Sequence, residues 1–188
     1  MSAQSWKEVL VSSSSDGPTL TAAARASCIP VADRIVLPNH YFAPGRLLRV
    51  TLGGRISCAV TTPGTARFDI CMGAAGTTIV FDTGAINLNV AGKTTVPFLF
   101  TATLACRAAG NGTTTTFFPT EAFFQSEALV GSPLPSVGGS GCLLLPVGTP
   151  AVGAGADNTA ASALDVFFTQ TLATGSMTVH TFMVESPN

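Results

Sequence analysis

Apolar and polar residues alternate one by one along most of this chain, and this alternation constrains the fold more than any other feature of the sequence. In the stretch R-L-L-R-V-T-L, one face carries Leu48, Val50 and Leu52, and the opposite face carries Arg49 and Thr51. Successive side chains of a β-strand point to opposite faces of the sheet. Such a stretch therefore predicts a strand with one buried and one solvent-exposed side.

The same alternation recurs in other segments, which are separated by turn residues. In A-R-F-D-I-C-M it divides the side chains into two sets, Ala66, Phe68, Ile70 and Met72 on one face and Arg67, Asp69 and Cys71 on the other. About eight to ten such strands, bounded by Gly and Pro, predict an all-β fold, either an antiparallel sandwich or a barrel. Helix signals are nearly missing, and we expect at most a turn or two at Thr21 to Ala26 and at Asp157 to Ala163.

One long segment lacks the alternation. From Ala128 to Ala156 the chain has no charged residue and is rich in Gly and Pro. It encloses one apolar run, C-L-L-L, from Cys142 to Leu145. We interpret this segment as a short buried strand between two loops.

Charged residues are unusually sparse. They make up 10% of the chain, against about 25% in an average soluble protein, and the net charge is -1. Charge repulsion therefore does little to keep copies of this chain apart. We expect the protein to cover part of its surface against copies of itself or against a partner. A surface rich in Thr and Ser, polar without being charged, is the alternative.

Several classes of partner are not expected. The nine Lys and Arg residues are scattered and form no basic run, which argues against nucleic acid. The most apolar run, Val96 to Cys106, is interrupted by Pro97 and is shorter than the roughly 20 residues of a membrane-spanning helix. No basic stretch followed by an apolar core opens the chain, so we expect neither a membrane partner nor a secretory signal.

The cysteines do not have metal-site spacing. The chain has five of them, Cys28, Cys58, Cys71, Cys106 and Cys142. None forms a C-x-x-C pair, and neither histidine lies near a cysteine in sequence, so no zinc site is expected. We interpret the cysteines as reduced, partly buried thiols that pack as small apolar side chains.

The tripeptide Gly92-Lys93-Thr94 has the form of the end of a phosphate-binding loop. Such a loop follows a strand and precedes a helix, whose N-terminal amides meet the phosphate. Here the residues after Lys93 alternate as a strand, and Pro97 opposes a helix. The position of the first loop glycine holds Asn87. We therefore interpret Lys93 as a strand entry and expect no nucleotide or other cofactor.

No cluster of catalytic residues is evident. His40 lies in the loop L-P-N-H-Y-F-A-P-G, and His180 lies within the last strand. The segment G-G-S-G-C lacks the final glycine of a nucleophile elbow. We expect a structural protein and not an enzyme.

The start of the chain differs from the rest. We divide the chain into an N-terminal arm, residues 1–18, and a single β domain, residues 19–188. The arm contains a short apolar strand, W-K-E-V-L-V, followed by a Ser-rich tether. Such a strand either pairs with its own sheet edge or reaches a neighbour, and we favour the neighbour because the tether has little reason to pack. The candidate contact residues are Trp6, Val9, Leu10 and Val11.

Several segments together carry a resemblance to a known family. They are N-H-Y-F-A-P-G-R-L-L-R-V-T-L-G-G-R-I-S, T-T-P-G-T-A-R-F-D-I-C-M-G, T-L-A-C-R-A-A-G, S-E-A-L-V-G-S-P and M-V-E-S. The chain, from about residue 8 to residue 185, resembles the jelly-roll capsid decoration (cement) proteins of tailed bacteriophages. The resemblance implies an antiparallel β-sandwich of jelly-roll type with an extended N-terminal arm. It also implies a homotrimer on the outer capsid surface, bound to the major capsid protein and assembled in the host cytoplasm.

Two other readings stay open. The first is a tail, baseplate or fibre-head jelly-roll protein, which in a receptor-binding form would carry exposed aromatic residues in its loops. The second, more remote, is an enzyme built on a β-sandwich.

Overall fold

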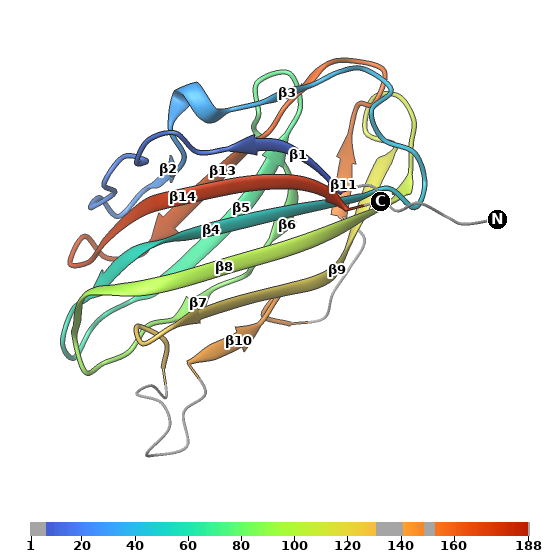
Figure 1. Cartoon of the computed structure of the whole chain (residues 1–188). Coiled ribbons are helices and arrows are strands. Elements are labelled where there is room, and N and C mark those ends of the chain that lie inside the picture. The colour runs from blue at the N-terminus through green and yellow to red at the C-terminus, as the bar shows by residue number, and fades with distance from the viewer. Residues whose placement is uncertain (1–6, 131–140, 149–152, 188) are drawn as a thin grey trace.

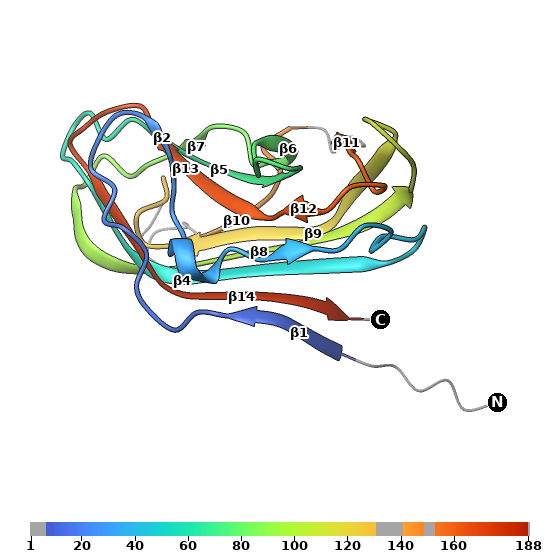
Figure 2. The same cartoon turned by 90° about the horizontal axis from the view of Figure 1, so that it is seen from above.

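The computed structural model describes residues 7–130, 141–148 and 153–187. Of these residues, 57% are in β structure and 2% in helix, and the strands pair antiparallel. They form two main sheets that face each other, as Figures 1 and 2 show. The predicted all-β antiparallel sandwich is therefore confirmed. The jelly-roll topology is not established by the strand order and stays a prediction.

The larger sheet has seven strands in the order β1-β14-β4-β8-β9-β10, with β11 also paired to β9. Their bounds are β1 Lys7–Ser12, β4 Leu47–Cys58, β8 Lys93–Ala108, β9 Thr115–Ser126, β10 Cys142–Leu144, β11 Gly153–Ala156 and β14 Ser176–Pro187. Strands β1 and β10 thus lie at opposite ends of the six-strand path (Figure 1).

The smaller sheet has five strands in the order β2-β13-β5-β6, with β7 also paired to β5. Their bounds are β2 Arg25–Ser27, β5 Thr65–Met72, β6 Thr78–Asp82, β7 Ile86–Asn87 and β13 Asp165–Gln170. A separate pair joins β3 Val36–Leu37 to β12 Ser162–Ala163, and the single 3-10 turn among the described residues is η1, Val31–Asp33.

Phenylalanines from both sheets form the centre of the core. The ring centre of Phe68 on β5 lies 5.0 Å from that of Phe100 on β8 and 5.1 Å from that of Phe168 on β13. Phe124 on β9 lies 5.5 Å from Phe68. All four side chains are buried, and burial of each contributes about 1.5–3 kcal/mol. This cluster holds the two sheets together.

The alternation predicts the inward faces correctly and one outward face wrongly. The inward residues of the segments 48–52 and 66–72 are all fully buried. On the outward face of β5, however, Asp69 is 1% exposed and Cys71 is 0% exposed. This face was expected to meet solvent. It is buried because arginine side chains lie over it, as described below.

Neither of the two helical turns expected from the sequence is present. Residues 21–24 form an exposed bend, and β2 begins at Arg25. Asp157 accepts hydrogen bonds from the backbone N–H and the hydroxyl of Thr159, and the side chain of Asn158 bonds to the backbone of Phe42. Short polar side chains that bond to the backbone in this way compete with helix formation.

Candidate functional site

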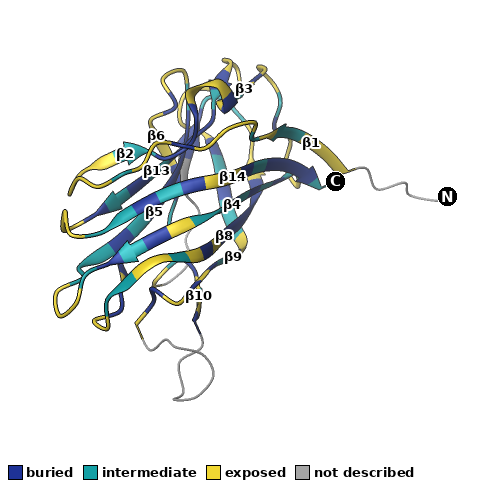
Figure 3. Cartoon of the chain, turned by 60° about the vertical axis from the view of Figure 1, so that its left-hand side comes forward, coloured by how far each residue is buried: buried dark blue, intermediate teal, exposed yellow. Residues whose placement is uncertain are grey.

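The N-terminal segment forms the edge strand of the larger sheet. β1 pairs antiparallel with β14, with Val9 opposite Glu185. Leu10 and Val11 pack partly buried against the core, whereas Val9 is 53% exposed, and Figure 3 shows the exposed start of this strand. Of the two alternatives for the arm, the structure shows pairing with its own sheet. Contact with a neighbour stays a prediction, and Trp6 lies outside the described residues.

The Ser-rich segment after β1 packs along β14, so the expectation of a loose tether is wrong. Three of its backbone N–H groups donate to carbonyls of β14 at 2.7 to 2.8 Å, Ser13 to Phe182, Gly17 to Val179 and Leu20 to Met177. A Cβ added to Gly17 would lie 2.2 Å from the carbonyl oxygen of Cys28, so only glycine fits there. Residues 7–20 therefore lie along β14.

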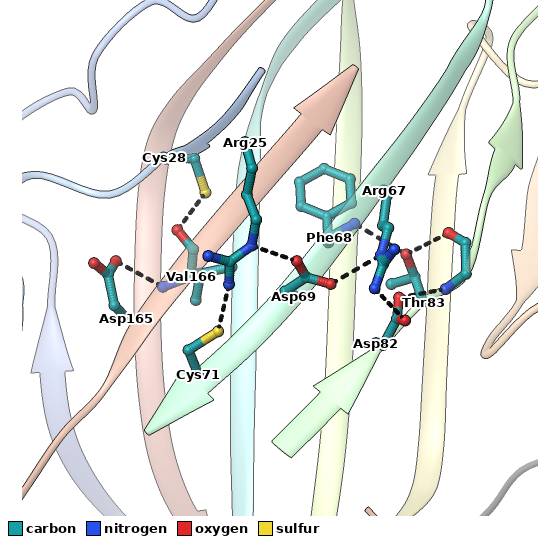
Figure 4. A network of polar contacts seen from close by, with 11 residues as sticks. Arg25, Cys28, Arg67, Phe68, Asp69, Cys71, Asp82, Thr83, Asp165 and Val166 are labelled. Carbon is teal, nitrogen blue, oxygen red and sulfur yellow. Dashed lines mark hydrogen bonds and ion pairs between the residues drawn. The ribbon is translucent and has the colours of Figure 1, made fainter. Parts of the chain in front are cut away.

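A row of ion pairs covers the outer face of the smaller sheet (Figure 4). The buried carboxylate of Asp69 accepts from Nε of Arg25 at 2.8 Å and from Nε of Arg67 at 3.1 Å. Arg67 also donates to Asp82 on β6, and the guanidinium of Arg25 lies 3.9 Å from the ring centre of Phe167. One carboxylate thus holds two arginines from different strands across the face of the sheet.

The row continues to Asp165 at the start of β13. Its carboxylate accepts from the hydroxyl of Ser27 at 2.6 Å and from the backbone N–H of Val166 at 2.8 Å, and it pairs with Arg34 at 3.2 Å. Burial raises the pKa of Asp165, although Ser27 and Arg34 act in the opposite direction. We call the whole set the charged face, and its members are Arg25, Arg34, Arg67, Asp69, Asp82 and Asp165.

Burial makes the thiols next to this face less acidic than free cysteine. Burial raises the pKa of Cys71 to about 12, against the lowering effect of Arg25, whose Nη2 lies 2.9 Å from its sulfur. Burial also raises the pKa of Cys28. Four of the five cysteines are buried, and the fifth, Cys142, is exposed. Since the thiolate is the nucleophile, the buried thiols act as core side chains, as the sequence predicts.

Every Lys and Arg of the chain engages the chain's own atoms. Six of the nine form ion pairs, namely Lys7, Arg25, Arg34, Arg49, Arg67 and Lys93. The other three are Arg46 and Arg107, which stack on the rings of Tyr41 and Phe118, and Arg55, which donates to the carbonyl of Thr95. Two thirds of the positive side chains are therefore paired with carboxylates of the chain itself.

The end of the larger sheet at β10 is apolar instead of charged. Four exposed side chains lie around it, Leu99, Val130, Leu144 and Val147, and we call this set the β10 edge. Leu144 is 79% exposed. The segment after β10 bridges the two sheets, because the N–H of Leu145 donates to Ala122 of β9 and the N–H of Val147 donates to Thr83.

Three hollows surround the β10 edge. Their volumes are about 250, 300 and 470 Å³. Their apolar lining includes Leu129, Cys142, Leu143, Pro97, Phe98, Phe123, Leu145 and Pro146. The charged side chains in the lining are Glu121 and Glu127, which pair with Arg49 and Lys93 at 3.3 and 3.5 Å. The edge is thus hollowed, apolar and without unpaired charge among the described residues.

The sequence predicts the position of this strand correctly but not the exposure of its side chains. Residues Cys142–Leu144 of the run C-L-L-L form β10, yet Cys142 and Leu144 are exposed rather than buried. The reason is position, because β10 lies at the end of the sheet and pairs with β9 alone. The lack of charge from Ala128 onward was the signal that could have identified an apolar surface here.

The other residues considered from the sequence do not come together. Lys93 begins β8, which confirms the strand entry. His40 lies in a loop with φ at 58°, and His180 pairs with Asp16 at 3.0 Å on the outside of β14. In the described parts of the chain, no three His, Cys, Asp or Glu side chains gather as a metal site would require. The described residues also include no helix long and apolar enough to cross a membrane.

Comparisons with protein-family models, with curated proteins and with solved structures found no match to this chain.

Proposed function

We propose that this chain is a structural protein of a bacteriophage virion, a capsid decoration (cement) protein that binds the outer capsid as a homotrimer and stabilises it. The segments that resemble such proteins support this proposal, and so does the antiparallel sandwich. Its function is to hold protein surfaces together and involves neither catalysis nor a cofactor. The jelly-roll topology, the trimer and the place on the capsid belong to this proposal.

The observation that carries the proposal is the exposed β10 edge. Exposed apolar side chains that gather at one end of a sheet are typical of surfaces that contact another protein. Burial of one leucine such as Leu144 in an interface contributes about 1.5–3 kcal/mol before the cost of association. Since apolar side chains dominate the described residues of the edge, the partner surface that we propose is apolar where it meets Leu144. The partners we propose are the major capsid protein and further copies of this chain.

Locating the protein in the virion tests the proposal. Cryo-electron microscopy of the phage particle should show density that fits the sandwich on the outer capsid, where capsomers meet. Density at the tail, baseplate or fibre would instead support the alternative structural role and contradict decoration. Absence of the chain from purified virions, measured by mass spectrometry, would contradict both.

Sedimentation of the purified protein tests the trimer separately. We expect a trimer at tens of micromolar, or trimers that form when capsids are added. A monomer that binds capsids only as a monomer would contradict the threefold part of the proposal.

A further inference from the structure

The turn between β8 and β9 contains the pair Asn111-Gly112, and Asn111 is the one asparagine of the chain that a glycine follows. The turn residues from Asn111 to Thr114 are all exposed. Gly112 has a φ of 61°, a conformation that glycine adopts without strain and that other residues rarely adopt. The shape of the hairpin turn therefore favours a glycine directly after this asparagine.

An exposed Asn-Gly pair reacts without an enzyme. The backbone nitrogen of Gly112 attacks the side-chain amide carbon of Asn111, and glycine has no Cβ to shield that nitrogen. A new C–N bond forms, and the amide nitrogen leaves as ammonia with the proton that the backbone nitrogen gives up. Water then opens the cyclic succinimide by breaking one of its two C–N bonds. The product is aspartate or, where the chain now runs through the side-chain carbon, isoaspartate.

In the folded chain the attacking nitrogen is held in another contact. The backbone N–H of Gly112 donates to the carboxylate of Asp157, which directly follows β11. The same carboxylate accepts from the backbone N–H of Thr159 at 2.8 Å and from its hydroxyl at 2.6 Å. Close by, the carbonyl of Gly110 accepts from the backbone N–H of Asn158 at 2.9 Å. The turn after β8 and the turn after β11 are thus joined at neighbouring residues.

Ring closure is incompatible with this contact, because it removes the proton that Gly112 donates to Asp157. The nitrogen becomes more negative as the proton leaves, and a carboxylate beside it disfavours that charge. Asp157 is also a poor base for taking the proton. Its pKa is lowered below the ordinary carboxyl value, chiefly by the hydroxyl and the backbone N–H of Thr159. A carboxylate of this kind accepts a hydrogen bond but not a whole proton.

We infer that Asn111 is a deamidation site of this protein and that Asp157 slows the reaction in the folded chain. Water is the co-reactant, and the loss of ammonia makes the change irreversible. The product carries a new carboxylate next to the N–H that Asp157 accepts, where the two like charges repel each other. Deamidation therefore loosens the contact between the two turns.

Deamidation kinetics test the inference. Wild type and Asp157→Ala are incubated at neutral pH, and peptides that contain residue 111 are analysed by mass spectrometry, with aspartate and isoaspartate separated by chromatography. We expect Asn111 to react at least about fivefold faster in Asp157→Ala, because a hydrogen bond to a charged group is lost. Thr159→Ala is the matched control, since it removes a side-chain contact of the same turn and keeps the carboxylate that Gly112 contacts. Its rate should stay close to that of wild type.

Two further measurements keep the test decisive if Asp157→Ala does not fold. Asp157→Asn keeps the size of the side chain and removes its charge, so its rate should lie between those of wild type and Asp157→Ala. Wild type unfolded in urea should react at Asn111 before any other asparagine, and several-fold faster than native wild type. Equal rates in native wild type and the folded Asp157 variants would overturn the role of Asp157. No reaction at Asn111 in the unfolded chain would overturn the site itself.

Discussion

The charged face and the β10 edge are two surfaces of one small sandwich, and they use the chain's few charges in opposite ways. On the charged face, Arg25 and Arg67 close over the buried carboxylate of Asp69. At the β10 edge, Leu144 and Val147 stay exposed around three hollows. The charges of the first surface are paired within the chain, whereas the second surface exposes apolar side chains.

This difference shows how a chain with few charged residues can have one face of paired charges and another of exposed apolar side chains. Each ion pair of the charged face is made within the chain, so these side chains cannot serve an outside partner without being released. Breaking a buried pair is costly, whereas covering an exposed leucine is favourable. Association through the β10 edge therefore requires no rearrangement of the charged face.

The largest contrast should appear in thiol reactivity. Cys142 is exposed on β10, whereas Cys71 is buried behind Arg25. We expect Cys142 to be alkylated in the native protein at least about a thousandfold faster than Cys71, because local opening around Cys71 costs about 4 kcal/mol or more. Mass spectrometry of peptides from a labelling time course measures both rates. Equal rates for the two thiols would mean that the charged face is open.

Next in size is the effect of the central carboxylate. Asp69→Asn should lower the free energy of unfolding by about 3 kcal/mol, because two arginines lose a buried counter-charge. Asp82→Asn is the matched control, since Asp82 pairs with one arginine, Arg67, accepts one backbone N–H, from Gly84, and is 38% exposed, and it should cost about 1 kcal/mol or less. Urea denaturation measures both values. A loss for Asp69→Asn no larger than for Asp82→Asn would show that the charged face does not stabilise the sheet.

A smaller effect on stability, but a clear one on binding, is expected at the β10 edge. Leu144→Asp should change the unfolding free energy by about 0.5 kcal/mol or less and weaken association with capsids or copies at least about tenfold. Val31→Asp is the control, since Val31 is 75% exposed and lies in η1, just before β3, which pairs with β12 and not with the larger sheet. Sedimentation with capsids measures the binding. Equal capsid binding by the Leu144→Asp and Val31→Asp variants would show that the β10 edge is not part of the interface.

The smallest effect concerns pH. Since burial raises the pKa of Asp165, the folded protein binds this proton more tightly than the unfolded chain does. Between the ordinary carboxyl pKa and the raised one, the wild-type unfolding free energy therefore falls as pH rises. Asp165→Asn lacks this contribution, so the stability difference, wild type minus variant, should be most positive at acid pH. A difference that grows as pH rises would contradict the raised pKa of Asp165.

The parts of this comparison that depend on local pattern could be predicted, and those that depend on distant partners could not. The inward residues of β4 and β5 follow from alternation, and the strand entry at Lys93 follows from the residues beside it. Burial of Asp69 depends on Arg25, 44 positions earlier in the chain. The packed tether depends on β14, as the bond between Ser13 and Phe182 spans 169 positions.

The exposure of the β10 side chains could not be predicted either, because it also depends on strands that are distant in the sequence. An apolar run such as C-L-L-L reads identically in the middle of a sheet and at its end. Only the strand order, which places β10 beyond β9 with no further strand, leaves Leu144 exposed.

Hydrogen exchange of the capsid-bound protein, compared with the free protein, tests the central claim most directly. The claim is that the β10 edge binds the partner and the charged face does not. We expect new protection of the amides in residues 119–130 and 142–147, and none in residues 21–24 and 73–77, which border the charged face. Protection of those bordering segments with no change around β10 would contradict the account.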